Sequence, residues 1–383
     1  MSVLIEDSPR NIVDWICESV DAKIASGTIV TPWASPWLSH PNLKPRAVDR
    51  VQELQGRGVP VLFDPMTHAL QMSGVGDFRF YDEYDLWGGP RGDLSDAVLR
   101  EEHVARVFEV QQSLAVRHLA PTELLHTGLS NASARALELA REAVRLDPKC
   151  VVGVAGTMPF WASGGALDAH VGALASLTPA EWVVTVVHSD KAIPPHFSAE
   201  GAHGLCRTVR ALSELGPVHV SHGDFGGLPA IAAGATSVGS GWDFRQRRCS
   251  YVDYAARPGG VGGGGGWNHR PTLAGLLGTL LLNEATVVES RDVALVSRLG
   301  GLPAAPAPRP TYDHHMTVLT AAVETLRSES DLRRRYELLT RMYSAANANW
   351  AAVRRHGNLA AGAPEWIEPL AGGLALYGAT EGW

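Results

Sequence analysis

Four titratable side chains that could perform acid/base or nucleophilic chemistry stand at or just after the ends of short apolar runs: Asp64, His222, Asp224 and Asp243. Two carboxyl groups in one site suit such chemistry. One can ionise as a nucleophile while the other, its pKa raised by burial or by the neighbouring charge, keeps its proton. A single aspartate at a strand end is most often a turn or cap residue. The prediction of a catalytic site therefore depends on several such residues converging on one face.

Residues that could bind a substrate surround these four positions. Glycine turns follow the last two apolar runs, and the backbone N–H groups of such turns can bind a phosphate or another anion. Alternatively, the glycines only permit tight turns. Arg245 could pair bidentately with a phosphate or carboxylate, or lie on a solvated basic edge. The predicted substrate-binding residues are His68, Gln71, His126, Asp190, Gly226, Gly227, Gly239, Ser240, Gly241, Trp242 and Arg245.

Two other chemistries are open at the same positions. Lys191 could form a Schiff base if burial lowered its pKa, although its polar, proline-rich surroundings favour an exposed lysine or a pair with Asp190. A metal could be held by Asp64 or Asp224 together with histidines, namely His68, His126, His188 and His222. These histidines form no HxH or HxxxH pair, and the four cysteines form no CxxC pair. We therefore expect no bound metal and no organic cofactor.

The elements that must position these residues alternate between strands and helices. Seven short, β-branched runs predict strands buried on both faces, at Gly27–Thr31, Val59–Phe63, Thr122–His126, Val151–Ala155, Trp182–His188, Val218–His222 and Thr236–Ser240. Helical patterns separate them at 45–55, 101–116, 132–146, 167–177 and 199–215. This alternation predicts an α/β fold, a (β/α)8 TIM-type barrel, with a weaker eighth strand near Phe78–Tyr81. Reactive groups of such barrels lie at the carboxyl ends of the strands, where the candidates stand.

Three regions are expected along the chain. Residues 1–255 form the barrel, 256–271 form a glycine-rich loop, and 272–383 form a helical extension packed on the barrel. Within the extension, helices are predicted over Leu273–Glu284, Val293–Leu299, His315–Arg327 and Leu332–Arg355, with a Pro/Ala linker at 302–310.

Composition narrows the class of protein. With 45% hydrophobic residues, 19% charged residues and a formal net charge of −7, the chain is typical of a folded domain and not of a broadly basic nucleic-acid coat. No apolar run is long enough for a membrane span, and the N-terminus is unlike a secretory signal. Isolated cysteines favour a reducing compartment, so a cytoplasmic location is expected. The expected partners are a substrate bearing a base or phosphate, no membrane, and a second copy or another protein.

Two segments resemble the queuine/archaeosine tRNA-guanine transglycosylase superfamily, which has a (β/α)8 fold. Val61–Gln71 is similar to that family's strand ending in an aspartate, with a downstream glutamine. The stretch from His219 through Ala230–Ala235 to Asp243 and Tyr251 is similar to its last two strands. The resemblance implies that Asp64 is the acid/base carboxyl that handles the base. It also implies that a second carboxylate attacks the anomeric carbon of the sugar and holds a covalent glycosyl intermediate.

The chain departs from that family at two points. The position of the family's nucleophile falls closest to Gly239, so Asp243 would have to act from four residues later. The family's zinc site of three cysteines and a histidine has no counterpart. These departures favour DNA or a small nucleoside over tRNA as the substrate.

Three functions are consistent with these patterns. The first is a barrel enzyme that transfers a glycosyl group between bases through paired aspartates, on a nucleobase or sugar-phosphate substrate. The second is a lyase or a metal-assisted hydrolase in the same barrel. The third is a non-catalytic barrel subunit of a larger assembly, in which the glycine-rich loop and the helical tail are docking elements.

Overall fold

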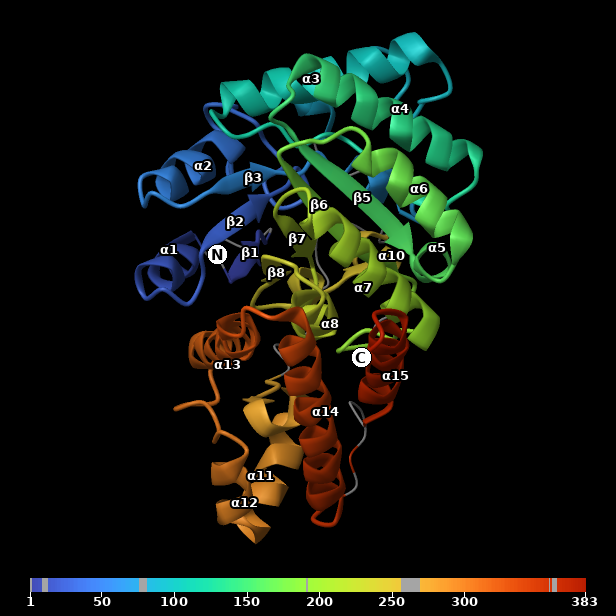
Figure 1. Ribbon diagram of the computed structural model, residues 1–383. Coiled ribbons are helices and arrows are strands. Elements are labelled where there is room, and N and C mark those ends of the chain that lie inside the picture. Colours follow the sequence, from blue (N-terminus) through green and yellow to red (C-terminus); the bar gives the residue numbers. More distant parts are fainter. Residues whose placement is uncertain are drawn as a thin grey trace.

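A parallel β-barrel surrounded by helices forms the body of the protein in a computed structural model (Figure 1). The structure describes residues 2–8, 13–75, 81–190, 192–255, 269–357, 359 and 364–383. The barrel strands are β1 (Val3–Glu6), β2 (Gly27–Val30), β3 (Val61–Phe63), β4 (Leu124–Leu125), β5 (Val151–Thr157), β6 (Glu181–His188), β7 (Val218–Ser221) and β8 (Ser237–Ser240). A short strand β9 (Cys249–Ser250) pairs with the end of β6.

The strands lie in the order β3-β2-β1-β8-β7-β6-β5-β4, and every pair in this path is parallel. The segment before β4 completes the ring, because Arg117 pairs with Leu62 of β3 and Leu119 pairs with Val151 of β5. The buried side chain of Gln111, in the helix before this segment, bridges β3 and the segment. Its amide nitrogen donates to Phe63 O and to Leu119 O, at 2.9 Å each. The fold is therefore a (β/α)8 barrel, as the alternation of strands and helices predicts.

One layer of side chains fills the lower interior of the barrel. It forms a separate apolar cluster with one residue from each of six strands or strand-like segments: Leu4, Ile29, Leu62, Leu119, Val151 and Val183. Because side chains alternate between the two faces of a strand, the residues two positions later point into the same interior. That next layer contains Glu6 after Leu4 and Asp64 after Leu62. The register of the barrel therefore brings these two carboxyl groups into one interior layer.

Helices cover the outside of the barrel. They are α1 (Val13–Asp21), α2 (Ala47–Gln55), α3 (Ala97–Ser113), α4 (Asn131–Leu146), α5 (Met158–Trp161), α6 (Gly165–Ala175), α7 (Ala199–Ser213) and α8 (Leu228–Ala232). The helix that packs beside β1 and α8 comes much later in the chain, and it is α13 (Pro308–Ser328). Tyr312 of α13 shares a hydrogen bond of 3.1 Å with Ser19 of α1, and Thr320 donates to Ile24 O at 2.6 Å.

Two further segments form the rest of the molecule (Figure 1). One lies between β8 and α13, and the other follows α13. These elements are α9 (Phe244–Arg247), α10 (Tyr251–Tyr254), a hairpin of β10 (Thr272–Leu273) and β11 (Gly278–Thr279), α11 (Leu282–Arg291), α12 (Val293–Arg298), α14 (Leu332–Arg354) and α15 (Ile367–Thr380). Gly373 of α15 lies so close to α7 that a Cβ there would meet Ala202 at 2.5 Å. His203 of α7 also shares a hydrogen bond of 2.9 Å with Thr380. The last helix therefore packs directly on the barrel (Figure 1).

All seven predicted strands are confirmed, with ends shifted by a few residues. The eighth strand is β1, which the sequence did not predict; Tyr81 instead begins the 3-10 helix η2 (Tyr81–Tyr84), and residues 78–80 lie outside the described residues. The helix predicted over Leu273–Glu284 is wrong at its start, where the β10–β11 hairpin and the 3-10 helix η4 (Ala274–Leu276) precede α11. The helices α1 and α15 were not predicted.

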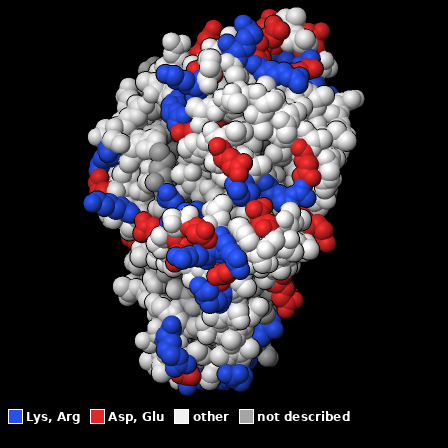
Figure 2. Space-filling view, in the orientation of Figure 1, with Lys and Arg blue, Asp and Glu red and all other residues white. Residues whose placement is uncertain are grey.

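Two surface properties bear on the expected partners. On the face seen in Figure 2, basic and acidic side chains lie intermingled. Among the described residues, no helix is both long enough and apolar enough to cross a membrane. Residues 256–268, which contain most of the predicted glycine-rich loop, lie outside the described residues, as does Lys191.

Candidate active site

Glu6 is a deeply buried carboxyl group, with 1% of the residue exposed. It ends β1, and its Oε1 accepts hydrogen bonds from Ser221 Oγ at 3.0 Å and from His222 N at 2.9 Å. Its Oε2 is buried and has no hydrogen-bond partner among the described residues. His222 Nε2 lies 3.7 Å from this oxygen. One oxygen of the Glu6 carboxyl group is thus held by two hydrogen bonds, and the other is available to bond with a substrate.

Burial raises the pKa of Glu6 above its ordinary value, and the nearby charge of Asp64 adds to that effect. The positive charge that His222 can carry and the two hydrogen bonds to Oε1 act in the opposite direction but do not outweigh burial. The side chain therefore keeps a proton at a pH where an exposed glutamate would have lost it. The unpartnered Oε2 is the natural place for that proton.

His222 is oriented by the chain that follows β8. Its Nδ1 lies 3.2 Å from the carbonyl oxygen of Gln246, which can only accept a hydrogen bond. In neutral His222 the proton is therefore on Nδ1, and the lone pair of Nε2 faces Glu6. His222 has a φ of 52°, a left-handed conformation that is uncommon outside glycine and is often found at functional sites.

Asp64 follows β3 and is half-buried. Its Oδ1 accepts a hydrogen bond of 2.7 Å from the backbone of Met66, which has a left-handed φ of 56°. His68 stands on the 3-10 helix η1 (Thr67–Gln71) and is 4% exposed, and burial lowers its pKa, so the ring is neutral. Electrostatic interactions connect Asp64 with both His68 and Glu6. The structure therefore brings together three predicted residues, Asp64, His68 and His222, and adds Glu6.

Gly239 of β8 provides the space in which the Glu6 carboxyl group stands. A Cβ at position 239 would overlap Glu6 Oε1 and would lie 2.8 Å from His222 N. Position 239 is also where the resemblance places the nucleophilic carboxylate of the transglycosylases. In this chain a carboxyl group occupies that neighbourhood, but it comes from β1 and not from β8.

We expect Gly239→Ala to destabilise the protein by about 1–3 kcal/mol, the usual cost of overpacking, because the added methyl group displaces Glu6. The cost should be smaller in a Glu6→Ala background, where the clash with the carboxyl group is gone and only the close approach to His222 N remains. A double-mutant cycle of urea unfolding measures this coupling. Gly172→Ala, where a Cβ would meet nothing within 4 Å, is the control. Equal costs of Gly239→Ala in both backgrounds would contradict the assignment.

The structure places Asp224 away from the barrel interior, in a second buried cluster. Its Oδ1 lies 3.5 Å from His315 Nε2 of α13, and its Oδ2 lies 3.9 Å from Arg247 Nε. Ser240 Oγ and Thr272 Oγ1 bond the two ring nitrogens of His315, at 3.3 and 2.8 Å. The cluster therefore connects the ends of β7 and β8 to α13. We infer a structural role for Asp224 and Ser240 in place of the predicted catalytic and substrate-binding roles.

Burial raises the pKa of Asp224 to about 6 from an ordinary 3.8, against the opposing charge of Arg247. The unfolded chain therefore loses this proton first as the pH rises. Protonated Asp224 therefore makes its full contribution to the free energy of unfolding below pH 4. That contribution decreases as the pH rises to about 6. We expect the free energy of unfolding of the wild type, relative to Asp224→Asn, to fall by about 3 kcal/mol between pH 4 and pH 7, at 1.36 kcal/mol per pKa unit.

Urea unfolding of both proteins at several pH values measures this difference. Asp82→Asn is a suitable control, because the Asp82 side chain is 78% exposed. Parallel stability curves for the wild type and Asp224→Asn would show that Asp224 has no raised pKa in the folded protein.

Asp243, the predicted nucleophile, is the N-cap of α9. Its Oδ1 accepts a hydrogen bond of 2.8 Å from Arg245 N, and the side chain of Gln246 completes a capping box. The common structural role of an aspartate at a strand end therefore explains this residue.

The carboxyl group that partners Asp64 is Glu6. The sequence could have indicated Glu6 as a strand-end residue, because it directly follows the apolar run Val3–Ile5. That run is very short, so the strand was not predicted.

The predicted anion-binding glycine turns are filled by the protein itself. Gln246 Oε1 accepts from the backbone N–H groups of Trp242 and Asp243, at 2.9 Å each. A Cβ at Gly241 would collide with the Gln246 side chain, and a Cβ at Gly227 would lie 2.7 Å from Val238. Gly226 similarly packs against the Phe197 ring. These contacts support the alternative interpretation, in which the glycines permit close packing and tight turns.

The remaining predicted substrate-binding residues lie around the carboxyl ends of the strands. The side chains of Gln71 and Asp190 each accept a hydrogen bond of 2.7 Å from a backbone N–H group, that of Leu124 and that of Ala192 respectively. Both side chains therefore stabilise the local backbone. Trp242 is buried and packs edge-on against Trp15. His126 is exposed and lies 3.2 Å from Thr157 at the end of β5. Of these four, only His126 is exposed, so its role as a substrate-binding residue stays a prediction.

Within the part of the chain that the structure describes, no group of three or more His, Cys, Asp or Glu side chains is arranged to hold a metal ion. His188, one of the four histidines considered for a metal, instead packs edge-on against Phe197. Its pKa is lowered to about 4, mainly by burial.

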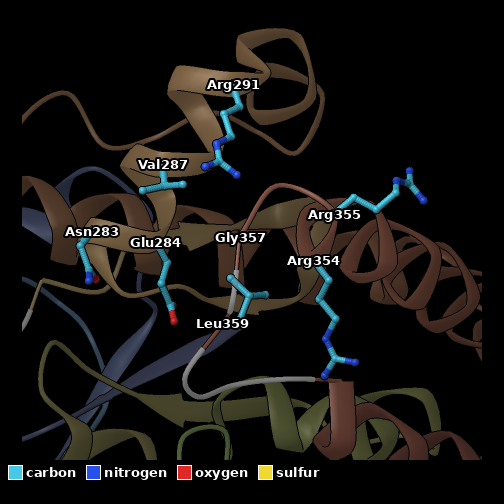
Figure 3. A pocket seen from close by; sticks show the side chains of 8 residues that line it. All are labelled: Asn283, Glu284, Val287, Arg291, Arg354, Arg355, Gly357 and Leu359. Carbon is cyan, nitrogen blue, oxygen red and sulfur yellow. The ribbon is translucent and has the colours of Figure 1, made fainter.

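A pocket of about 470 Å³ lies in the extension, between α11 and the end of α14 (Figure 3). Arg291 and Arg354 line it, and both already have partners: Arg291 donates to His356 O, and Arg354 lies 3.2 Å from Glu365. This pocket is formed by elements other than those that carry Glu6 and Asp64.

The fold and the buried carboxyl pair define the class of this protein as a (β/α)8 barrel with titratable groups at the carboxyl ends of its strands. No protein-family model matches the chain, and no curated protein matches it in sequence. Among solved structures, the chain is similar to a psychrophilic glycoside hydrolase family 10 endo-β-1,4-xylanase, with a TM-score of 0.36 and 9% sequence identity. The alignment covers 62% of this chain and 85% of that chain. A similarity of this degree carries no argument about function.

Proposed function

We propose that the protein is a glycosyl-transferring barrel enzyme in which Glu6 and Asp64 perform the chemistry. The observation that carries this proposal is the buried, unpartnered Oε2 of Glu6, in the same interior layer as Asp64. A buried polar atom without a partner is costly, so it is expected where a ligand supplies the partner. Glycosyl transfer commonly uses a pair of carboxyl groups.

The environments of the two carboxyl groups assign their roles. Glu6 keeps its proton because of burial and is the general acid, acting through Oε2. Asp64 accepts a backbone hydrogen bond and is less buried, so it is the carboxylate that attacks. The resemblance to the transglycosylases implies the opposite assignment, with Asp64 as acid/base and the second carboxylate as nucleophile. The proposed exchange of roles follows from burial.

The proposed reaction has two balanced steps. First, an Asp64 oxygen bonds to the anomeric carbon, the bond to the leaving group breaks, and the Glu6 proton moves to that group. A glycosyl–Asp64 ester and an ionised Glu6 result. Second, an incoming acceptor, a base N–H or water, gives its proton to Glu6 and attacks the anomeric carbon. The ester bond then breaks, which regenerates both carboxyl groups.

The nearby His222 supports this cycle. While Glu6 is ionised, its carboxylate stands in a buried site, with His222 Nε2 as a polar neighbour at 3.7 Å. His68 is held neutral by burial, so it can act as a hydrogen-bond partner without adding a second positive charge. The proposed substrate class is a nucleoside, a nucleotide or a related glycoside.

The test is a search for a covalent intermediate. Purified protein is incubated with purine and pyrimidine nucleosides and with 2-deoxy-2-fluoro glycosides that carry activated leaving groups. Intact-mass spectrometry then measures the added glycosyl mass, and peptide mapping locates it. We expect the label on Asp64. A label on Asp243 would restore the original prediction, and neither label nor product with any compound would favour the non-catalytic subunit.

A further inference from the structure

Three arginines follow β8, and the structure separates one of them from the others. Arg247 and Arg248 are buried and have carboxylate partners, Asp224 at 3.9 Å and Asp253 at 3.1 Å. Arg245 is only partly buried, and its guanidinium forms no ion pair among the described residues. Its Cζ instead lies 5.4 Å from the centre of the Trp33 ring, within the range of a cation–π contact.

Trp33 connects this arginine to the proposed active site. It follows β2 and is partly exposed, and it packs edge-on against Tyr254 with ring centres 5.3 Å apart. Tyr254 is buried, which raises the pKa of its phenol, and Glu6 and Asp64 lie near enough for their charges to add to that effect. The Arg245–Trp33–Tyr254 series therefore leads from the edge of the barrel to the carboxyl pair.

Two backbone N–H groups that follow β8 are already used within the protein and are not available to an anion. The N–H groups of Trp242 and Asp243, which follow β8, already donate to Gln246 Oε1. A side chain can bind an anionic group here in their place. Among the three arginines that follow β8, Arg245 is the one for which the described residues show no carboxylate partner, and a ring on Trp33 would lie next to it.

We infer that the substrate carries an anionic group, a phosphate or a carboxylate, which Arg245 binds while Trp33 packs against the adjoining ring. This inference rests on the proposed function for the position of the reacting carbon. The planar guanidinium suits either anion, because both accept two parallel hydrogen bonds. Stacking on tryptophan suits a base or the apolar face of a sugar. The substrate is thus a charged sugar or nucleotide and not a neutral glycoside.

The experiment measures binding separately from turnover. In a Glu6→Gln background, calorimetry compares ribose 5-phosphate with ribose and glucuronate with glucose, so the two pairs distinguish phosphate from carboxylate. We expect the preferred charged sugar to bind at least about tenfold more tightly than its neutral partner, the scale of one charge-assisted contact. Arg245→Gln should abolish that preference, and Arg245→Lys should retain part of it. Trp33→Ala should weaken charged and neutral sugars alike.

Arg334→Gln is the matched control, because it removes an equal charge from the exposed surface of α14. Equal affinity for charged and neutral sugars, or an equal loss in Arg334→Gln and Arg245→Gln, would overturn the inference. Turnover of neutral glycosides without any charge preference would overturn it while the proposed function stands. Charge-selective binding that depends on Arg245, without a covalent intermediate on any substrate, would instead reject the proposed function alone.

Discussion

Glu6→Gln is expected to lower kcat/KM by about 10²–10⁴-fold on substrates with poor leaving groups, the usual contribution of a general acid. Substrates with activated leaving groups lose that group without a proton, so their kcat/KM, which reports the first step, should stay near the wild-type value. Their kcat should fall, because Glu6 also takes up the acceptor's proton in the second step. The glutamine can keep both hydrogen bonds that anchor Oε1, from Ser221 and His222, but it has no proton to transfer. Rates on matched glycosides with leaving groups of different pKa measure the effect.

The pH profile gives an independent check on the same variant. The proposed mechanism needs Glu6 protonated, so wild-type kcat/KM should fall as the pH rises through the pKa of Glu6. Because burial raises that pKa, the fall should occur above the range of an ordinary glutamate. Glu6→Gln should lack this alkaline limb. Glu214→Gln, whose side chain is 61% exposed at the end of α7, is the control. Equal losses on good and poor leaving groups would exclude the acid role.

Asp64→Asn is expected to lower turnover by about 10⁴-fold or more on both kinds of substrate, the scale of removing a nucleophile. The loss should not depend on the leaving group, because no covalent ester can form. Asparagine can still accept the hydrogen bond from Met66 N, so the fold should be retained. Added azide should restore part of the activity and yield a glycosyl azide, which mass spectrometry detects.

Asp85→Asn is the control for this variant, since the Asp85 side chain is 80% exposed on the outside of the barrel. Circular dichroism and the urea midpoint establish that both variants are folded. Full activity in Asp64→Asn would reject the assignment, and the covalent label would then have to be sought elsewhere. A leaving-group dependence in Asp64→Asn but not in Glu6→Gln would show that the two roles are reversed, as the transglycosylase resemblance implies.

The strand pattern was the most reliable guide to this fold. The runs that became β5 and β6 are long and β-branched, as strands buried on both faces must be, and they needed no tertiary context to be recognised. The rule that reactive groups follow the carboxyl ends of barrel strands selected Asp64 and His222, and the structure places both near Glu6. The run Val3–Ile5 was too short to be recognised, because its strand exists through pairing with β2 and β8.

The members of the site were decided by tertiary structure. Asp224 and Asp243 stand in the same kind of sequence position as Asp64, but the chain after β7 and β8 turns Asp224 toward α13 and uses Asp243 as a helix cap. A strand alternates its side chains by a local rule, whereas a loop does not. The direction of a side chain just beyond a strand therefore depends on what packs against that loop.

By itself, the amino-acid sequence determined the strand and helix alternation, and with it the barrel, since hydrophobic periodicity is a local property of the chain. It also determined which carboxyl and imidazole groups stand near strand ends. Only the tertiary structure decided that Glu6 joins Asp64, because their meeting depends on the register of β1 against β8 and on the space that Gly239 leaves. The raised pKa of Glu6 has the same origin, because burial results from packing the whole barrel.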